Sequence, residues 1–219
     1  MSDGDGEERE PMQAERVVDR ADRVERIEHA AVAAARAGDA VAFAALFDSY
    51  HGPITSYLYR LTGSRETADD LAQETFIKAF RALGRTSDDL NFRAWLYRIA
   101  TNSAVSWRRR QQLLTWLPFS RSDDSGTPEF EPGHDPRLAE SLAEQELVAT
   151  ALRRIGPKHA SALLLRHHLR LTVDETAAAL DINANTAKVR LFRARRAFID
   201  AYNALDTDTN RTPARETRS

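Results

Sequence analysis

Five basic side chains and no acidic one lie on a predicted helix that follows Asn183. Its outward face is formed by Asn185, Thr186, Val189, Phe192, Arg193 and Arg196, with Lys188, Arg190 and Arg195 on the flanks. Lys and Arg bind DNA phosphates, an arginine fork fits a guanine edge, and apolar side chains contact thymine methyl groups. This combination predicts a surface that reads duplex DNA. A solvated basic face on an ordinary surface helix is the alternative.

A short capped helix and a turn are expected to position that surface. Thr172 and Glu175 have the spacing of a capping box, and Asn183 can cap the helix that follows the turn. One stripe of that second helix is apolar and is predicted to face the core: Ala187, Leu191, Ala194 and Phe198. The segment is therefore predicted to be a helix-turn-helix.

A second surface is expected on the helix over about residues 65–83. Its buried stripe is predicted to hold Ala68, Leu71, Ala72, Thr75, Phe76, Ala79 and Leu83. The opposite face carries Asp70, Gln73, Glu74, Ile77 and Arg81. An isoleucine surrounded by charges is typical of a protein-binding site, although a single exposed isoleucine is also common. A charged face is a better interpretation of Asp69, Asp70 and Glu74 than a metal cluster.

A third surface is expected on the helix over about residues 92–112. Periodicity points Phe92, Leu96, Ile99, Ala100, Ser103 and Trp107 inward, and Arg98, Thr101, Asn102, Val105 and Arg109 outward, with Trp95 and Tyr97 near the edges. Basic groups follow a phosphate backbone, and an asparagine beside apolar surface can hold an unstacked base. This face is suggestive of single-stranded nucleic acid.

Charge is strongly segregated along the 219 residues, although the net charge is only −2. Six arginines and no acid lie between Phe92 and Arg121, whereas residues 122–146 hold eight acids and one arginine. No segment alternates with period two, so an all-α fold is predicted. The expected organisation is an acidic, disordered extension (1–23), a helical domain (24–114), a flexible linker (115–137), a second helical domain (138–204) and a disordered tail (205–219).

No enzymatic site is recognisable in the sequence. The chain has no cysteine, and the adjacent His167 and His168 do not share a helix face. There is no glycine-rich phosphate loop and no nucleophile–base pattern. We therefore expect no catalytic residue, no metal and no cofactor. The absence of a long apolar run predicts no membrane insertion and a cytoplasmic protein.

Four runs in order give the chain a specific resemblance, which extends over about residues 37–204. They lie at 37–43, 68–76, 92–102 and 186–195, and include Ala68-Asp69-Asp70-Leu71-Ala72-Gln73-Glu74 and Trp95-Leu96-Tyr97-Arg98-Ile99-Ala100-Thr101-Asn102. On these residues the chain resembles bacterial RNA polymerase sigma factors of the extracytoplasmic-function group. The resemblance implies a promoter-specificity factor that binds core RNA polymerase and aids strand opening.

The resemblance also implies roles for particular residues. Core polymerase would bind the face formed by Asp70, Gln73, Glu74, Ile77 and Arg81. The −10 element, as a single strand with one base flipped out, would contact Ala82, Thr86, Ile99 and Asn102, with Arg98 and Arg109 on the same basic face. The −35 duplex would be read by Lys188, Val189, Phe192 and Arg193, beside Asn185, Thr186, Arg190 and Arg196. An anti-sigma factor is an expected further partner.

Some positions depart from the family pattern. Thr86 stands where many members carry an aromatic residue, and Ser106 replaces a common aspartate. Arg170 and Asp181 stand where glycine is usual. Two other functions stay open at this point: a stand-alone helix-turn-helix regulator of operator DNA, and a small nuclease.

Overall fold

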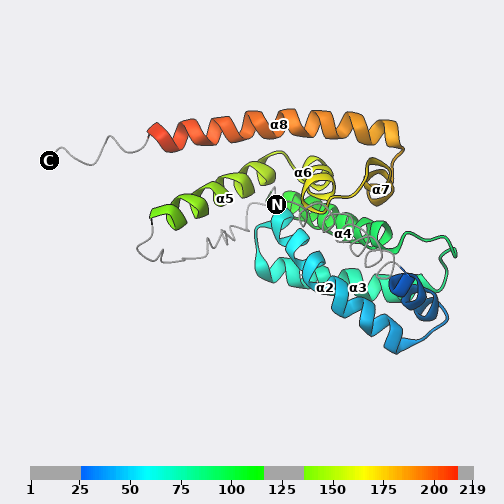
Figure 1. The fold of residues 1–219 in the computed structure, drawn as a ribbon. Coiled ribbons are helices and arrows are strands. Elements are labelled where there is room, and N and C mark those ends of the chain that lie inside the picture. Colours follow the sequence, from blue (N-terminus) through cyan, green and yellow to red (C-terminus); the bar gives the residue numbers. More distant parts are fainter. Residues whose placement is uncertain (1–25, 116–135, 212–219) are drawn as a thin grey trace, which may run out of the picture. The chain divides into compact units, whose positions relative to one another are not determined.

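The computed structural model describes residues 26–115 and 136–211, and every regular element within them is helical (Figure 1). The helices are α2 (Ala40–Thr62), α3 (Arg65–Leu83), α4 (Phe92–Thr115), α5 (Pro136–Arg154), α6 (Pro157–Leu163), α7 (Val173–Ala179) and α8 (Ala184–Arg211), with a π-helical turn η1 (Leu164–His168) after α6 and a helical segment over residues 26–36 before α2. The predicted all-α fold is confirmed. The expected extension and most of the expected linker lie outside the described residues. None of the described helices is long and apolar enough to cross a membrane.

The described residues form two compact units, of which the smaller holds residues 26–50 and 80–90. Its buried apolar residues include Val32, Leu46 and Leu83. Phe43 and Phe80 pack edge to face with ring centroids 5.0 Å apart. Apolar burial and aromatic contact are thus the main forces that hold this small unit together.

The end of the first helical segment is fixed by a Schellman motif. Gly38 adopts a φ of +99°, and the N–H groups of Gly38 and Asp39 donate to the carbonyls of Ala35 and Ala34 at 3.1 Å each. The Asp39 carboxylate then accepts from Val41 N–H at 2.8 Å and caps α2. One helix thus ends and the next begins within two residues.

α2 is one continuous helix that passes through Gly52 and Pro53. A proline removes one backbone donor and does not force a break when both flanking segments bury apolar side chains. Leu46 on one side and Ile54, Tyr57 and Leu58 on the other are buried, which favours continuity.

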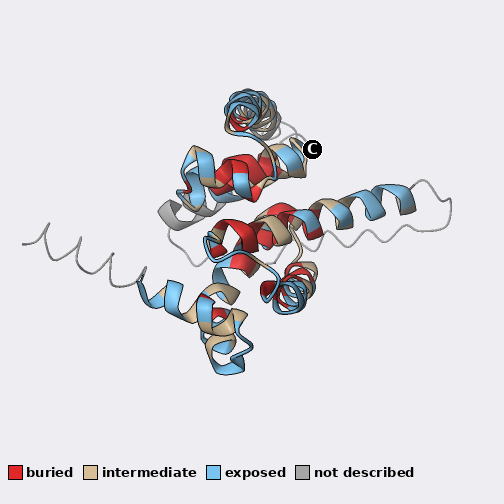
Figure 2. Ribbon diagram, turned by 90° about the vertical axis from the view of Figure 1, so that its right-hand side faces the viewer, coloured by how far each residue is buried: buried red, intermediate tan, exposed pale blue. Residues whose placement is uncertain are grey.

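The larger unit holds residues 51–79, 91–115 and 136–211. Every member of the predicted α3 stripe that lies in it is buried, and Figure 2 shows such buried positions on one side of the helices. The Tyr57 and Tyr97 rings meet at 5.2 Å, and the Tyr57 and Thr101 hydroxyls are 2.7 Å apart. Burial raises the pKa of both tyrosines to about 12, so both phenols stay protonated.

The predicted helix-turn-helix is present as α7 and the start of α8. Thr172 and Glu175 form a complete capping box, and Asn183 Oδ1 accepts from Thr186 N–H at 2.8 Å. Arg170 and Asp181 adopt left-handed φ values of 56° and 54°. These two positions are where glycine was expected, so two non-glycine residues occupy a conformation that favours glycine. α8 continues to Arg211, past the expected domain end at Ala204.

Candidate nucleic-acid interface

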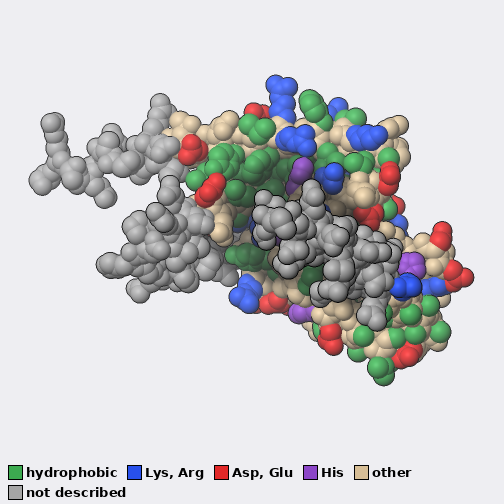
Figure 3. Space-filling view, viewed as in Figure 1, with side chains coloured by type: hydrophobic (Ala, Val, Ile, Leu, Met, Phe, Trp, Pro, Cys, Tyr) green, Lys and Arg blue, Asp and Glu red, His purple; other side chains and the backbone are tan. Residues whose placement is uncertain are grey.

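α8 separates a buried apolar stripe from a basic outer face. Ala187 and Ala194 are inaccessible and Leu191 is buried, which fixes the rotation of the helix. The side chains of the predicted duplex-reading face are exposed apart from Arg190, which is half-buried: Asn185, Thr186, Lys188, Val189, Phe192, Arg193 and Arg196. Phe192 is 66% exposed and Val189 50%. Figure 3 shows Lys and Arg side chains spaced along α8 at the top of the view.

The histidines behind α8 add little positive charge to this face. His167 Nε2 lies 3.5 Å from Arg195 Nη2. Burial, followed by the charges of Arg195 and Arg166, lowers the pKa of His167 below its usual value. The cationic character of the surface therefore comes from arginine and lysine at neutral pH.

The outer face of α3 has an apolar residue at its centre. Ile77 is 44% exposed, and Asp70, Gln73 and Arg81 are also exposed on this helix. Glu74 pairs with Lys78 at 2.6 Å in an i, i+4 contact. An exposed isoleucine ringed by polar groups has the composition of a protein-binding surface.

The loop over residues 84–90 connects α3 to the segment before α4. Ala82, at the end of α3, is exposed and Thr86 is half-buried. Thr86 Oγ1 donates to the Leu83 carbonyl at 2.7 Å, and its N–H donates to the same carbonyl at 3.1 Å. These local bonds hold Thr86 close to the end of α3.

The α4 face differs in part from its prediction. Asn102 and Arg109 are exposed and Arg98 and Ile99 are half-buried, so these four are accessible. Thr101, expected on the outer face, is 5% exposed, and its hydroxyl bonds to Tyr57 and to the Tyr97 carbonyl. Trp95 and Tyr97, expected near the edges, are also buried.

Three polar contacts join residues 91–98 to the helix-turn-helix and to the segment just before it, within the larger unit. Arg93 Nη2 donates to the Leu169 carbonyl at 2.6 Å, and Asn91 Nδ2 donates to Glu175 Oε1 at 3.3 Å. Arg98 Nη1 donates to Asp181 Oδ1, also at 3.3 Å. One predicted −10 contact is thus paired with a carboxylate of this chain.

Two features of the small unit were not found by sequence reasoning. Phe80 is 60% exposed on α3, and Arg36 reaches the 84–90 loop. Periodicity could have identified Phe80, because it follows Ile77 by three positions. Nothing local marks Arg36, whose partners are about fifty residues away in sequence.

Among residues 26–115 and 136–211, no group of three or more His, Cys, Asp or Glu side chains is placed to hold a metal ion. The carboxylates of Asp69, Asp70 and Glu74 therefore form no such cluster there. The candidate sites in the described residues are therefore exposed faces of helices.

The described residues define a helical protein that carries a helix-turn-helix with an exposed basic face. Two family models match the chain: Sigma-70 region 2 over residues 46–113, and Sigma-70 region 4 over residues 145–198. The RNA polymerase sigma-H factor of Pseudomonas aeruginosa is 33% identical over 179 residues, which cover 77% of this chain and 90% of that protein. The ECF RNA polymerase sigma factor SigL of Mycobacterium tuberculosis is 30% identical over 171 residues, which cover 77% of this chain and 93% of that protein.

Two solved structures share the fold. The structure of CnrH in complex with the cytosolic domain of CnrY has a TM-score of 0.61 at 22% identity and covers 81% of this chain and 98% of that one. The structure of RpoE from Bartonella quintana in complex with the anti-sigma factor NepR has a TM-score of 0.57 at 19% identity. It covers 74% of this chain and 96% of that one.

The chain belongs to the extracytoplasmic-function group of RNA polymerase sigma factors. It is a sigma factor that directs transcription initiation. A stand-alone helix-turn-helix regulator is not favoured, because that function leaves the region 2 match without an explanation.

Proposed function

We propose that this sigma factor reads its promoter with two surfaces and binds core polymerase with a third. The outer face of α8 binds the −35 element as duplex DNA. The 84–90 loop and the exposed residues of α4 bind the −10 element as a single strand, and the outer face of α3 binds core polymerase. The observation that carries this proposal is the α8 face, where Val189 and Phe192 are exposed among arginines. On the opposite stripe Ala187, Leu191 and Ala194 are buried and Phe198 is half-buried.

Two domains carry these surfaces in the proposal. Residues 24–114 form the domain for polymerase and the −10 element, and residues 138–204 form the domain for the −35 element, with residues 115–137 as a linker. The family matches at 46–113 and 145–198 fall within these two ranges, which supports the division.

Strand opening is driven by binding and involves no covalent step. A base flipped out of the duplex costs a few kcal/mol of stacking and pairing, which a pocket for the extruded base offsets. Ala82 and Thr86 from the loop side, and Ile99 and Asn102 from α4, supply the contacts to unpaired bases. Arg98 and Arg109 bind the phosphates beside them.

Reading both elements requires the α4 contact with the helix-turn-helix to open. The two elements lie roughly 25 base pairs apart, or about 85 Å of B-DNA. Arg98 bonds to Asp181 of the helix-turn-helix and Arg93 bonds to Leu169 just before it, so α4 and the helix-turn-helix lie within a few ångströms of each other at these contacts. The promoter-bound form therefore differs from this arrangement.

An anti-sigma factor is the remaining partner in the proposal. The RpoE of the similar solved structure binds one, according to its title. A cytoplasmic location follows from the requirement to meet polymerase and promoter DNA in the same compartment.

Reconstituted transcription tests the proposal. The purified chain with core polymerase is expected to start transcripts from a subset of templates in a promoter library, with permanganate-reactive thymines at the −10 element. Asn102→Ala should keep polymerase binding and lose that reactivity. Absence of initiation from every template, with neither domain binding DNA, would overturn the proposal.

A further inference from the structure

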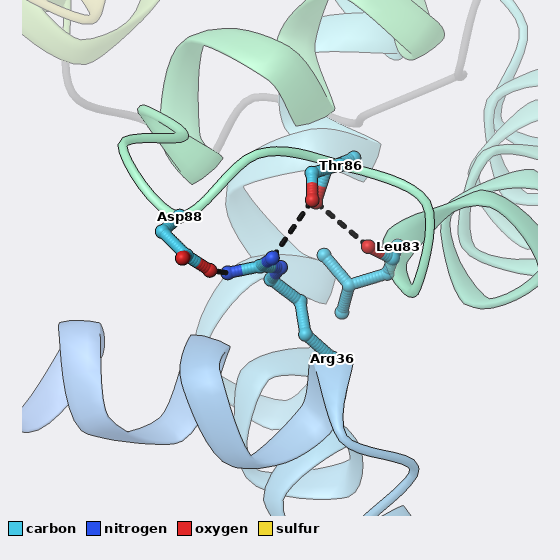
Figure 4. A network of polar contacts seen from close by, with 4 residues as sticks. All are labelled: Arg36, Leu83, Thr86 and Asp88. Carbon is cyan, nitrogen blue, oxygen red and sulfur yellow. Dashed lines mark hydrogen bonds and ion pairs between the residues drawn. The ribbon is translucent and has the colours of Figure 1, made fainter.

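The 84–90 loop is held from outside by one side chain. Arg36 Nη2 donates to the Thr86 carbonyl at 2.8 Å, and Nη1 pairs with the Asp88 carboxylate. Figure 4 shows the Arg36 side chain extending from its helix to this loop, with Thr86 and Asp88 on either side of the guanidinium. Within the described residues, the other hydrogen bonds of the loop are local, such as Arg85 N–H to the Ala82 carbonyl at 3.0 Å.

The two partners of Arg36 are not equivalent. The Asp88 side chain is 97% exposed, so its ion pair is screened by water and contributes little. The Arg36 side chain is only 20% exposed, and its bond to the Thr86 carbonyl is partly buried. The main contact is therefore the one from the guanidinium to the loop backbone.

The backbone that carries the Arg36 side chain is held by a helix end of fixed geometry. Arg36 lies in the last turn of the helix that the Schellman motif at Gly38 terminates. A Cβ on Gly84 would lie 3.4 Å from the Arg36 carbonyl oxygen, so the loop passes close to the end of this helix. A fixed backbone and a planar guanidinium together give the loop a fixed point of attachment.

The partial burial of the Arg36 guanidinium is energetically unfavourable. Its Nε is buried and has no hydrogen-bond partner within the described residues. Burial of a charged group that is only partly paired is unfavourable, so apolar packing alone would favour another side chain. The bond to the Thr86 carbonyl offsets part of the cost of this partly buried guanidinium.

We infer that Arg36 is a positioning residue that holds Thr86 and its loop in the shape that selects the unpaired −10 base. This inference rests on the proposed role of Thr86 in the −10 contact. Arg36 acts through the loop backbone and touches no DNA. Loss of its bond lets the loop adopt several shapes, so discrimination between bases falls while phosphate binding on α4 persists.

The test uses holoenzyme and a set of −10 single strands that differ in the base facing the loop. Arg36→Ala is expected to reduce the ratio of affinities between the best and the worst base by roughly fivefold or more. Arg36→Lys should recover part of the ratio, because an ammonium can still reach one partner. Arg26→Ala, an exposed arginine of the same helix, is the matched control and should leave the ratio unchanged.

Further measurements separate positioning from a loss of fold. Core-polymerase affinity and −35 duplex affinity should stay within about twofold of wild type. In Arg36→Ala/Thr86→Gly, discrimination should be no lower than in the worse single variant, because Arg36 acts by placing the Thr86 side chain, which the double variant lacks. Equal weakening on every −10 base, or a parallel loss of polymerase binding, would overturn the inference. A wild-type holoenzyme without any −10 preference would instead contradict the proposed function itself.

Discussion

Arg98 of α4 and Asp181 of the helix-turn-helix form an ion pair, with Arg98 Nη1 3.3 Å from Asp181 Oδ1. Asp181 has a left-handed backbone conformation, and its side chain is 74% exposed. The pair is therefore weak and sensitive to salt. It nevertheless places a carboxylate of the protein beside a cation that we assign to DNA phosphate.

Asp181→Asn should increase the affinity of the chain for a −10 single strand, because it removes the acidic competitor of Arg98. Asparagine adopts the left-handed conformation readily, so the turn should persist. The gain should be largest at low ionic strength and decline as salt is added. Fluorescence anisotropy across a salt series measures it. Asp174→Asn, an exposed acid of the same domain, controls for net charge and should give a smaller gain.

Ile77→Asp should disrupt core-polymerase binding. A charge at the centre of an apolar contact typically costs about 2 kcal/mol, or roughly 30-fold in affinity. Ile199→Asp on α8 is a matched control, since Ile199 is 50% exposed and Ile77 44%. Titration of each variant into labelled core polymerase gives the comparison. Equal affinities for the two variants would remove Ile77 from the interface.

Arg193→Ala should weaken binding to the −35 element by about 1–3 kcal/mol and relax the base preference at one position. Competition binding with a set of −35 duplexes measures both effects. The exposed Arg154, on α5, provides the control Arg154→Ala, which removes the same charge away from the α8 face. A uniform loss over all sequences would assign Arg193 to a phosphate instead.

Arg170→Gly should stabilise the protein by ~0.5–1 kcal/mol, because it relieves a left-handed residue at φ 56°. Urea unfolding followed by circular dichroism measures the change. Arg170→Ala retains the Cβ that causes the strain and should give no such gain. If both variants were equally stable, the arginine side chain rather than its backbone would explain the effect.

Acid should weaken the cap of α7. Burial raises the pKa of Glu175, but the hydrogen bonds from Thr172 and Asn91 and the charge of Arg93 outweigh it and hold the pKa below 4.5. A carboxyl with a lowered pKa stabilises the fold above its unfolded value, and this contribution is lost as the pH falls through the folded value. Unfolding experiments between pH 7 and about 3 should show this loss in wild type and not in Glu175→Gln.

Sequence patterns predicted the helix-turn-helix well, because its determinants are local. The capping box at Thr172, the cap at Asn183 and the alternation of buried and exposed residues on α8 all depend on neighbours within a few positions. The exposed Ile77 followed from the same periodicity. The residues that determine these features are close together in the sequence.

Contacts between distant segments could not be predicted in the same way. α4 has buried residues on more than one side, because it contacts α6 and α7 as well as Tyr57, so periodicity misplaced Thr101 and Tyr97. The continuity of α2 through Pro53 depends on the burial of residues on both sides of the proline. Arg36 reaches the 84–90 loop only after the chain has folded.

The π-helical turn over Leu164–His168 extends the helical run that begins with α6. Leu169 N–H donates to the Leu164 carbonyl at 2.9 Å, which closes a wider turn than an α-helix has. The wider turn accommodates one residue more than an α-turn holds, and Leu171 N–H still bonds to the Leu165 carbonyl at 3.0 Å. The chain thus carries a surplus residue just before the helix-turn-helix without interrupting the helical run from Pro157 to His168.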